Sequence, residues 1–396
     1  MANKSPDSFR FRSVRSRAEE FAATARRLDA ERAAGSAVVD EALRTTPQER
    51  WGTLAEHPAF LTSGVLGRIA EIVDRELNRQ PKYAEAIAVL GASIADAIAP
   101  DAYPSVIVAQ MRASAWKDYG KVLSYLARHD EALTIFDRAE SYVDELTYGV
   151  LAYDRAVIDL NRAITVSEMG RHDTALALLA QCKPVFRHHG DRNLHILCGY
   201  YEGVALQRLE RHREARETYL LLVAMEDSIE KRTLAAIHQT IGLCSIELRD
   251  FEAAEDSLTK AIGLHTELGQ PLDAAKGEYA RGRLLLRKGL ARRAIEHLRP
   301  VRHRFLVHSL AEEAGLCGLE IVEGMLQIGM ADEAERLART IMAEFMAARL
   351  NGRAISALGY LTEAITAKKA QPRLVTQVRE YVLSLRTAPE REFQPL

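Results

Sequence analysis

Histidine, cysteine and carboxylate side chains are the groups in this sequence that could act as metal ligands, nucleophiles or bases. Three histidines, His129, His172 and His212, recur at nearly constant spacing. Equivalent positions in neighbouring helical repeats are separated by a helix packing distance of roughly 8–10 Å, whereas zinc requires ligand nitrogens about 2 Å away. These histidines cannot converge on one ion, so we expect them in turns.

A second group of histidines lies closer together in the sequence. His188 and His189 precede Gly190, and His195 follows it. We expect this segment to form a loop, and no cysteine or carboxylate stands at ligand spacing beside the histidines. The sequence therefore predicts no bound metal and no cofactor.

The cysteines and the other catalytic motifs also favour a protein without covalent chemistry. No two cysteines form a CxxC pair, and each lies in a stretch with helical periodicity, so we expect buried free thiols and a reducing, cytoplasmic location. A glycine-rich phosphate loop, an HExxH motif and a GxSxG motif are all absent from the sequence. We therefore expect no enzymatic activity. The four cysteines are Cys182, Cys198, Cys244 and Cys317.

Charge is nearly balanced over the whole chain but is unevenly distributed along the sequence. The 53 Lys and Arg residues against 55 Asp and Glu residues argue against electrostatic binding of nucleic acid by the chain as a whole. Between Lys276 and Arg304, however, ten basic residues stand against two acids, Glu278 and Glu296. This cluster could bind an acidic peptide, a terminal carboxylate or a phosphate backbone. The alternative that we prefer is a basic helix surface matched by acidic neighbours such as Glu312 and Glu313.

The elements that would position these side chains are set by an internal repeat. One alanine recurs before an amphipathic helix at intervals of 43, 40, 39, 40 and 40 residues. A residue twelve positions earlier is small in five of the six repeats, and a larger residue usually follows the alanine by four positions. Glycine stands five positions before three of the alanines, where the end of a helix favours a left-handed residue. The six alanines are Ala132, Ala175, Ala215, Ala254, Ala294 and Ala334.

This spacing predicts antiparallel helix pairs that stack side by side. Two helices approach closely only where side chains are small, so we expect the small residue of the first helix to contact the alanine of the second. The larger residues share the face of the alanine and are expected to fill the space toward the next repeat. The small residues are Gly120, Ala163, Gly203, Gly242 and Gly282, and Val322 takes this place in the sixth repeat.

The first repeat, with Trp116, Gly120, Ala132, Phe136 and Ala139, resembles the tetratricopeptide repeat (TPR). The resemblance covers residues 113–348, with a period near 40 in place of the usual 34. Long repeats of this type resemble those of bacterial peptide-receptor regulators and maltose-type transcription activators. The resemblance implies an all-α, right-handed superhelical solenoid whose first helices line a concave groove.

The resemblance also implies ligand-binding positions on the first helix of each repeat. Tyrosine and arginine, which are enriched at binding hot spots, recur at these positions. Each could instead merely solvate the groove wall. The polar candidates for ligand binding are Lys117, Lys121, Ser124, Tyr125, Tyr200, Gln207, Arg208, Gln239, Glu247, Lys276, Tyr279, Arg283 and Arg287.

Four regions are expected along the chain. Residues 1–50 form a basic amphipathic helical segment, and residues 51–110 form a degenerate helical repeat or N-terminal cap. Residues 111–348 form the six TPR-like repeats. Residues 349–396 form capping helices, over 354–367 and 375–385, followed by a tail, because the end of a solenoid must cover its apolar face.

The N-terminal segment allows two interpretations. Val14, Ala18, Phe21, Ala25 and Leu28 follow a heptad-like spacing among many arginines. Such a helix could pack on the first repeats, which is the interpretation that we prefer. It could also form a homodimer or bind a partner helix, although it spans fewer than two heptads.

The function expected from these features is that of a cytoplasmic scaffold or regulator that binds a protein or peptide in its groove. No run of 18 apolar residues occurs, so no membrane span is expected. One alternative is a nucleic-acid-associated transcriptional regulator that uses the basic cluster. The other is a small-molecule sensor with a closed apolar pocket inside the groove.

Overall fold

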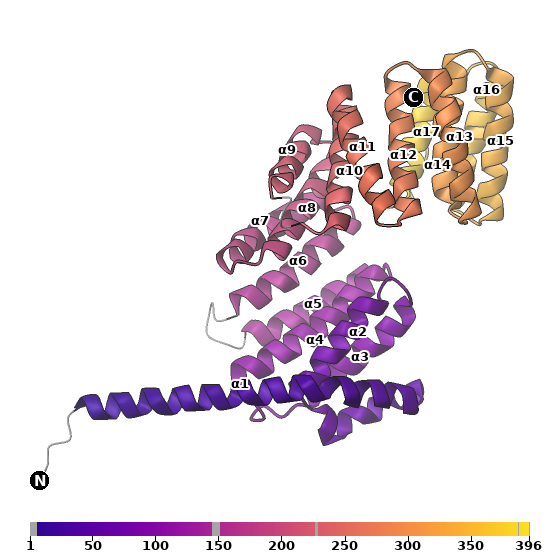
Figure 1. The fold of residues 1–396 in the computed structure, drawn as a ribbon. Coiled ribbons are helices and arrows are strands. Elements are labelled where there is room, and N and C mark those ends of the chain that lie inside the picture. The colour runs from indigo at the N-terminus through magenta and orange to yellow at the C-terminus, as the bar shows by residue number, and fades with distance from the viewer. Residues whose placement is uncertain (1–5, 145–150, 226–228, 387, 396) are drawn as a thin grey trace, which may run out of the picture. The chain divides into compact units, whose positions relative to one another are not determined.

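The computed structural model describes residues 6–144, 151–225, 229–386 and 388–395, with side chains from residue 19 onward. These residues form helices joined by short connections, and no strand occurs among them (Figure 1). The described helices include none that is both long and apolar enough to cross a bilayer. The predicted all-α class is confirmed.

Each predicted repeat consists of two consecutive helices. The first helix of each pair, called the A helix below, is α4 (Ser105–Tyr125), α6 (Ala152–Glu168), α8 (Arg192–Arg208), α10 (Lys231–Glu247), α12 (Pro271–Arg287) or α14 (Ala311–Gln327). The second, the B helix, is α5 (His129–Asp144), α7 (His172–His188), α9 (His212–Val223), α11 (Phe251–Glu267), α13 (Ala291–Val307) or α15 (Ala331–Ala347).

The repeat alanines lie where the sequence predicts, because all six are fully buried near the start of a B helix. The contact of the small residue differs from the expectation, however. A Cβ atom at Gly120 would overlap the ring of Phe136, and one at Gly282 would overlap the side chain of Leu298. The small residue thus leaves room for the large side chain that follows the alanine by four positions. That large side chain fills space within its own repeat instead of space toward the next one.

The turn between the two helices has a common backbone conformation. Gly170, Gly289 and Gly329 have φ of 79°, 75° and 79°, as the glycine spacing predicts. Glu210 and Arg249 stand at the same place in other repeats and also have positive φ, of 59° and 58°. The repeat therefore imposes the left-handed residue even where the side chain opposes it.

The chain divides into two compact units. The N-terminal unit comprises Met1–Val166 and Ala180–His189, and the C-terminal unit comprises Ser167–Leu179 and Gly190–Leu396. Each unit is described by itself below. The predicted region boundaries do not coincide with this division and stay a prediction.

The N-terminal unit begins with a long helix, α1 (Pro6–Thr45), followed by the short 3-10 helices η1 (Gln48–Glu56) and η2 (Pro58–Phe60). Helices α2 (Ser63–Glu76) and α3 (Pro81–Ala97) form the expected degenerate pair. Leu28 and the later apolar residues of α1 pack on this pair, whereas Phe21 is 78% exposed. The side chains of Val14 and Ala18, in the predicted seam, lie outside the described part of the chain.

The C-terminal unit continues the stack after α15. Helix α16 (Gly352–Thr366) packs on α15 as a further A helix would. Helix α17 (Pro372–Ser384) contacts α14 as well as α16. It therefore turns back along the A helices instead of stacking at the end as a B helix, and the capping role expected of α16 and α17 stays a prediction.

Candidate binding groove in the C-terminal unit

The inner face of the C-terminal unit is formed by its A helices. Helix α12 contacts both α10 and α14, whereas α11, α13 and α15 make no comparable contacts with one another in the described part of the chain. The A helices are therefore the more closely spaced layer, as expected for the concave side of a helical repeat.

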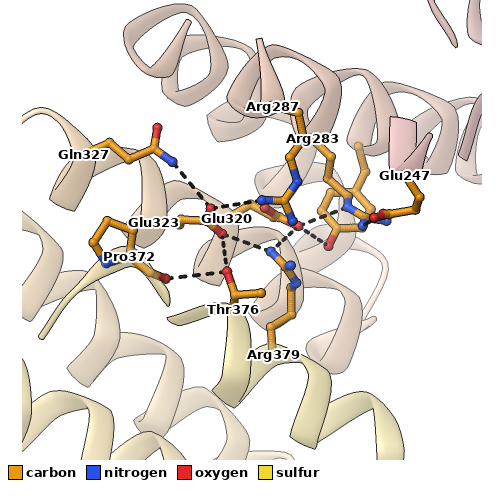
Figure 2. Close-up of polar contacts among 10 residues, drawn as sticks. Glu247, Arg283, Arg287, Glu320, Glu323, Gln327, Pro372, Thr376 and Arg379 are labelled. Carbon is orange, nitrogen blue, oxygen red and sulfur yellow. Dashed lines mark hydrogen bonds and ion pairs between the residues drawn. The ribbon is translucent and has the colours of Figure 1, made fainter. Parts of the chain in front are cut away.

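An arginine from α17 reaches this face and meets two carboxylates of α14 (Figure 2). Arg379 lies 2.7 Å from Glu320 and 3.2 Å from Glu323 through its Nη1 atom. The exposed fractions of these residues are 3%, 2% and 3%, respectively. Charges this deeply buried are tolerated only when each is paired and hydrogen-bonded, so the three side chains form one unit.

Two predicted groove arginines of α12 complete the cluster. Arg283 lies 2.9 Å from Glu247 of α10 and 3.2 Å from Glu320 of α14, and Arg287 lies 3.6 Å from Glu323. Figure 2 shows these side chains converging from three consecutive A helices. The arginines predicted to face a ligand are thus engaged with carboxylates of the same unit.

Neutral side chains satisfy the remaining polar atoms of the two carboxylates. Thr376 of α17 donates a hydrogen bond to Glu323 at 3.2 Å, and the Gln327 side-chain amide donates one at 3.4 Å. The hydroxyl of Tyr279 lies 3.4 Å from Glu320, and its ring meets Phe305 edge to face. Tyr279, Arg283 and Arg287, three of the predicted site residues, therefore lie together around one pair of carboxylates.

The electrostatics of the cluster depend on burial and on its like charges. Burial raises the pKa of the Glu323 carboxyl, and the neighbouring charge of Glu320 raises it further against the opposing effect of Arg379. Burial alone would lower the pKa of Arg379, but attraction to Glu320, Tyr279 and Glu323 outweighs it and raises that pKa. The arginine is thus held charged by the carboxylates that it covers.

Other predicted residues of the C-terminal unit lie apart from this cluster. Tyr200 packs against Tyr219, and burial raises its pKa, while Arg208 on the same helix is exposed. Gln239 is half-buried, and its Oε1 atom has no hydrogen-bond partner. Lys276 is exposed and lies 3.0 Å from Asp273.

The predicted residues of the N-terminal unit lie on α4. Lys117 lies 2.7 Å from Asp118, and Lys121 lies 2.8 Å from Asp74. Burial alone would lower the pKa of Lys117, but Asp118 outweighs it and raises that pKa. Tyr125 is 49% exposed. A cavity of about 260 Å³ beside them is lined mainly by α2, α3 and α4, with Asp118 in its wall.

The basic cluster of residues 276–304 is largely paired inside the protein. Arg281 and Lys288 lie near Glu255, and Arg302 lies 2.6 Å from Glu344. The prediction that Glu312 and Glu313 pair with this basic cluster was wrong, because both glutamates contact Arg386 instead. Six of the ten basic residues make ion pairs, namely Lys276, Arg281, Arg283, Arg287, Lys288 and Arg302.

The histidines form no metal site among the described residues. His129, His172 and His212 are the first residues of α5, α7 and α9, which agrees with the prediction that they stand at turns. The loop predicted from His188 to His195 is shorter than expected, since His188 belongs to α7 and His195 belongs to α8. The connection is short because both helices run to full length.

The cysteines are buried, as predicted, and none of the four forms a disulfide. Burial raises the pKa of the Cys244 thiol and of the Cys317 thiol to about 12 in each case. A thiol with so high a pKa is protonated near neutral pH and is a poor nucleophile.

Glu320, Glu323 and Arg379 are the cluster residues that the sequence analysis missed. Glu323 follows Val322 directly, as Arg283 follows Gly282, so it occupies the same position in the next repeat. Extending the groove positions into the sixth repeat would have found it. Arg379 carries no such signal, because α17 belongs to no repeat.

Stacked helix pairs with small residues at the A–B contact and a left-handed turn residue define the tetratricopeptide-type solenoid. No protein-family model matches the sequence, and no curated protein sequence matches it. Many solved structures share the fold, among them the three that follow. RapI in its apo form has a TM-score of 0.54 and 14% identity, over 69% of this chain and 97% of RapI.

The second structure is a Signal Transduction ATPase with Numerous Domains from Pyrococcus horikoshii, which carries a tetratricopeptide repeat sensor. Its TM-score is 0.60 at 13% identity, over 91% of this chain and 53% of that protein. The third is aspartyl phosphate phosphatase F from Bacillus subtilis, with a TM-score of 0.52 and 12% identity, over 82% and 85% of the two chains. At these identities the likeness shows the fold alone, and that fold is the predicted one.

Proposed function

We propose that this chain is a regulator or scaffold that binds a protein or peptide on the inner face of its A helices, without covalent chemistry. The observation that supports this most is the cluster in which Arg283 and the exposed Arg287 pair with the buried Glu320 and Glu323, because it places paired charges on adjacent A helices. Paired charges and aromatic rings on a concave wall are the means by which helical repeats recognise extended or helical segments.

The solved structures of the same fold support this proposal. One of them carries its tetratricopeptide repeats as a sensor in a signal-transduction protein. Side chains on the A helices of this unit remain accessible to a partner, since Arg208 of α8 and Lys276 of α12 are exposed and Tyr279 of α12 is half-buried. Tyrosine and arginine contribute strongly at interfaces because they combine apolar area with directed hydrogen bonds.

The alternative functions are less well supported. Binding of nucleic acid requires free positive charge, and most of the basic cluster makes ion pairs within the protein. A small-molecule sensor requires a pocket of roughly 300–1,000 Å³, and the cavity beside α4 is smaller, at about 260 Å³.

Cytoplasmic location is a further part of the proposal, and dimerisation through α1 is kept as the alternative to packing of this helix on the first repeats. The first is supported by four buried free thiols. The second is supported by the exposed ring of Phe21. A Phe21→Asp variant tests dimerisation by light scattering, because the substitution leaves the packed part of α1 intact. An unchanged oligomeric state would remove α1 as a dimer contact.

Site-specific photo-crosslinking tests the groove. A photoreactive phenylalanine analogue placed at Arg208 or Lys276, on A helices, is expected to capture a discrete partner in cells. The same group at Lys260 or Arg292, which are exposed on B helices, is the matched control. Capture from the B-helix positions alone would reject binding on the inner face, and so would capture from neither set.

A further inference from the structure

Helix α17 lies along α14 in the antiparallel direction. Thr376 and Arg379 of α17, and Arg386 just beyond its end, contact Glu323, Glu320 and Glu312 of α14 at 3.2, 2.7 and 2.7 Å. As the residue numbers rise in one helix they fall in the other, over most of the length of both. The last helix of the chain therefore occupies part of the A-helix face to which the proposed function assigns a partner.

The buried face of α17 has the pattern of a helical ligand in a groove. Val375, Val378, Val382 and Leu385 are buried at spacings of three, four and three residues. Arg379 lies among them as the single buried charge of the helix. Aliphatic anchors at i, i+3 and i+7 around one directed polar contact are typical of amphipathic helices bound to protein grooves.

The charges beneath α17 are balanced only when it is in place. Three carboxylates, Glu247, Glu320 and Glu323, then face Arg283, Arg287 and Arg379. Without α17, one negative charge is left in excess around Glu320 and Glu323, which are deeply buried when α17 is in place. Such a site binds a cation strongly, and a guanidinium best, because its fork of donors can serve two carboxylates at once.

The connection to α17 is exposed, and its far end is held by local contacts. Residues 367–369, between α16 and α17, are exposed, and Gln371 makes no side-chain capping bond to the helix. Beyond the helix, Tyr381 donates a hydrogen bond to the Arg391 carbonyl at 2.7 Å, and Phe393 packs on the Tyr381 ring. The residues after the helix also reach α16, where Arg353 lies 3.0 Å from Glu390 and the Tyr360 ring meets Phe393. Release of this segment must therefore break these contacts as well as those with α14.

We propose that α17 is the resident occupant of the binding groove, and that the partner which replaces it is a helical peptide segment with one arginine between aliphatic residues. This inference rests on the proposed function, since it names the recognition chemistry of the same face. The partner arginine takes the place of Arg379 between Glu320 and Glu323, and its aliphatic residues take the places of Val375, Val378 and Val382. Binding requires α17 to leave.

Exchange of α17 in the folded full-length chain tests the proposal. A site-specific protease sequence inserted between Lys368 and Lys369 allows the connection to be cut after folding. Fluorescein-labelled peptide of residues 371–396 is then added, and its anisotropy is measured. We expect the cut chain to take up the peptide saturably and the uncut chain to exclude it.

Two peptide variants separate the role of Arg379 from general stickiness. The R379A peptide is expected to bind at least about 100-fold more weakly, because it leaves a buried carboxylate pair uncovered. The R373A peptide is the matched control, since Arg373 is exposed on the same helix, and it should bind like the unchanged peptide. Equal binding of the R379A peptide would overturn the proposal, as would loss of the fold, seen by circular dichroism, when the cut chain releases α17.

Cross-linking from Lys276 distinguishes this inference from the proposed function. In the cut chain, an excess of the 371–396 peptide should suppress capture of the partner, and the R379A peptide should not. Capture that neither peptide changes would overturn the role of α17 and leave the proposed function standing. Absence of capture from any A-helix position, in cut and uncut chains, would reject both.

Discussion

The two units hold the helices that belong to no repeat, α1 and α17, by different means. In the N-terminal unit, α1 meets α2 at Gly35 and Gly64, and a Cβ atom at either glycine would overlap the backbone of the other helix. In the C-terminal unit, α17 meets α14 through side chains, with Arg379 between Glu320 and Glu323. A backbone contact tolerates no added atom, whereas a side-chain contact can be made by any helix that presents the same groups.

The surroundings of the glycine contact reinforce this difference. Glu31 of α1 accepts hydrogen bonds from the Ser63 and Tyr103 hydroxyls at 2.6 and 2.7 Å. Burial alone would raise the pKa of Glu31, but these bonds and Arg27 outweigh it and lower that pKa. Helix α1 is thus anchored to Ser63 and Tyr103, which lie on two different segments. Helix α17 instead covers two carboxylates that also pair with the arginines of α12.

Arg379→Ala is expected to have the largest effect on stability. It leaves two buried carboxylates with only the arginines of α12, so the free energy of unfolding of the C-terminal unit should fall by about 3–5 kcal/mol. Both tryptophans, Trp51 and Trp116, belong to the N-terminal unit. Urea unfolding followed by circular dichroism should therefore shift while tryptophan fluorescence does not. Arg373→Ala is the control, and an equal shift in that variant would show that the pairing is unimportant.

Gly64→Ala should have the next largest effect, and in the other unit. The added methyl group meets the backbone of Glu31 and Arg32, which cannot move aside without separating α1 from α2, so a loss of about 2–3 kcal/mol is expected. Gly242→Ala is the matched variant in a repeat, where the new atom meets the flexible side chain of Leu258 and the loss should be about 1 kcal/mol. Tryptophan fluorescence should report only the first change. Similar losses in both variants would remove the distinction between backbone and side-chain contacts.

Arg249→Gly should stabilise the C-terminal unit. Arg249 is exposed and has a φ of 58°, which costs a non-glycine residue roughly 1–2 kcal/mol. Glycine removes this strain but adds entropy to the unfolded chain, so the net gain should be about 0.5–1 kcal/mol in urea unfolding. Lys260→Gly, in the middle of α11, should instead lower the free energy of unfolding by about 1 kcal/mol, because glycine is unfavourable inside a helix. A loss in the Arg249 variant would contradict a strained turn.

His297→Gln should change the pH dependence by the smallest amount. His297 lies 3.1 Å from Glu278, and the hydrogen bond that it donates to this carboxylate raises the pKa of His297 above its ordinary value near 6.5. A raised pKa adds stability that is complete below pH 6.5 and is lost as pH rises through the folded pKa. The free energy of unfolding of the wild-type chain should therefore exceed that of the variant at pH 5.5, and this difference should be about 0.5 kcal/mol larger than the difference at pH 8.5. An identical difference at both pH values would contradict the ion pair.

The repeat could be predicted from the sequence because its causes are local. The alanines, the small residues and Gly170, Gly289 and Gly329 each satisfy a constraint within one helix pair, so spacing alone reveals them. Glu210 and Arg249 take the same left-handed turn without a sequence signal, because the flanking helices impose it.

The candidate site could be predicted only in part. Tyr279, Arg283 and Arg287 were placed on the groove side by their repeat positions, and they do lie together. Arg379 pairs with residues 56 and 59 positions earlier, and the sequence gives no register between α17 and α14. Carboxylates on a helix are usually solvated, so nothing in the pattern marked Glu320 as buried.

The lengthened repeat has a consequence for what can lie on the inner face. Helix α14 has 17 residues, and so it extends about 25 Å at 1.5 Å per residue. The 13 residues of α17 extend about 20 Å and fit within that length. A wall this tall accommodates more than three turns of a guest helix lying parallel to its own axis, so that side chains from several of those turns are recognised by one repeat.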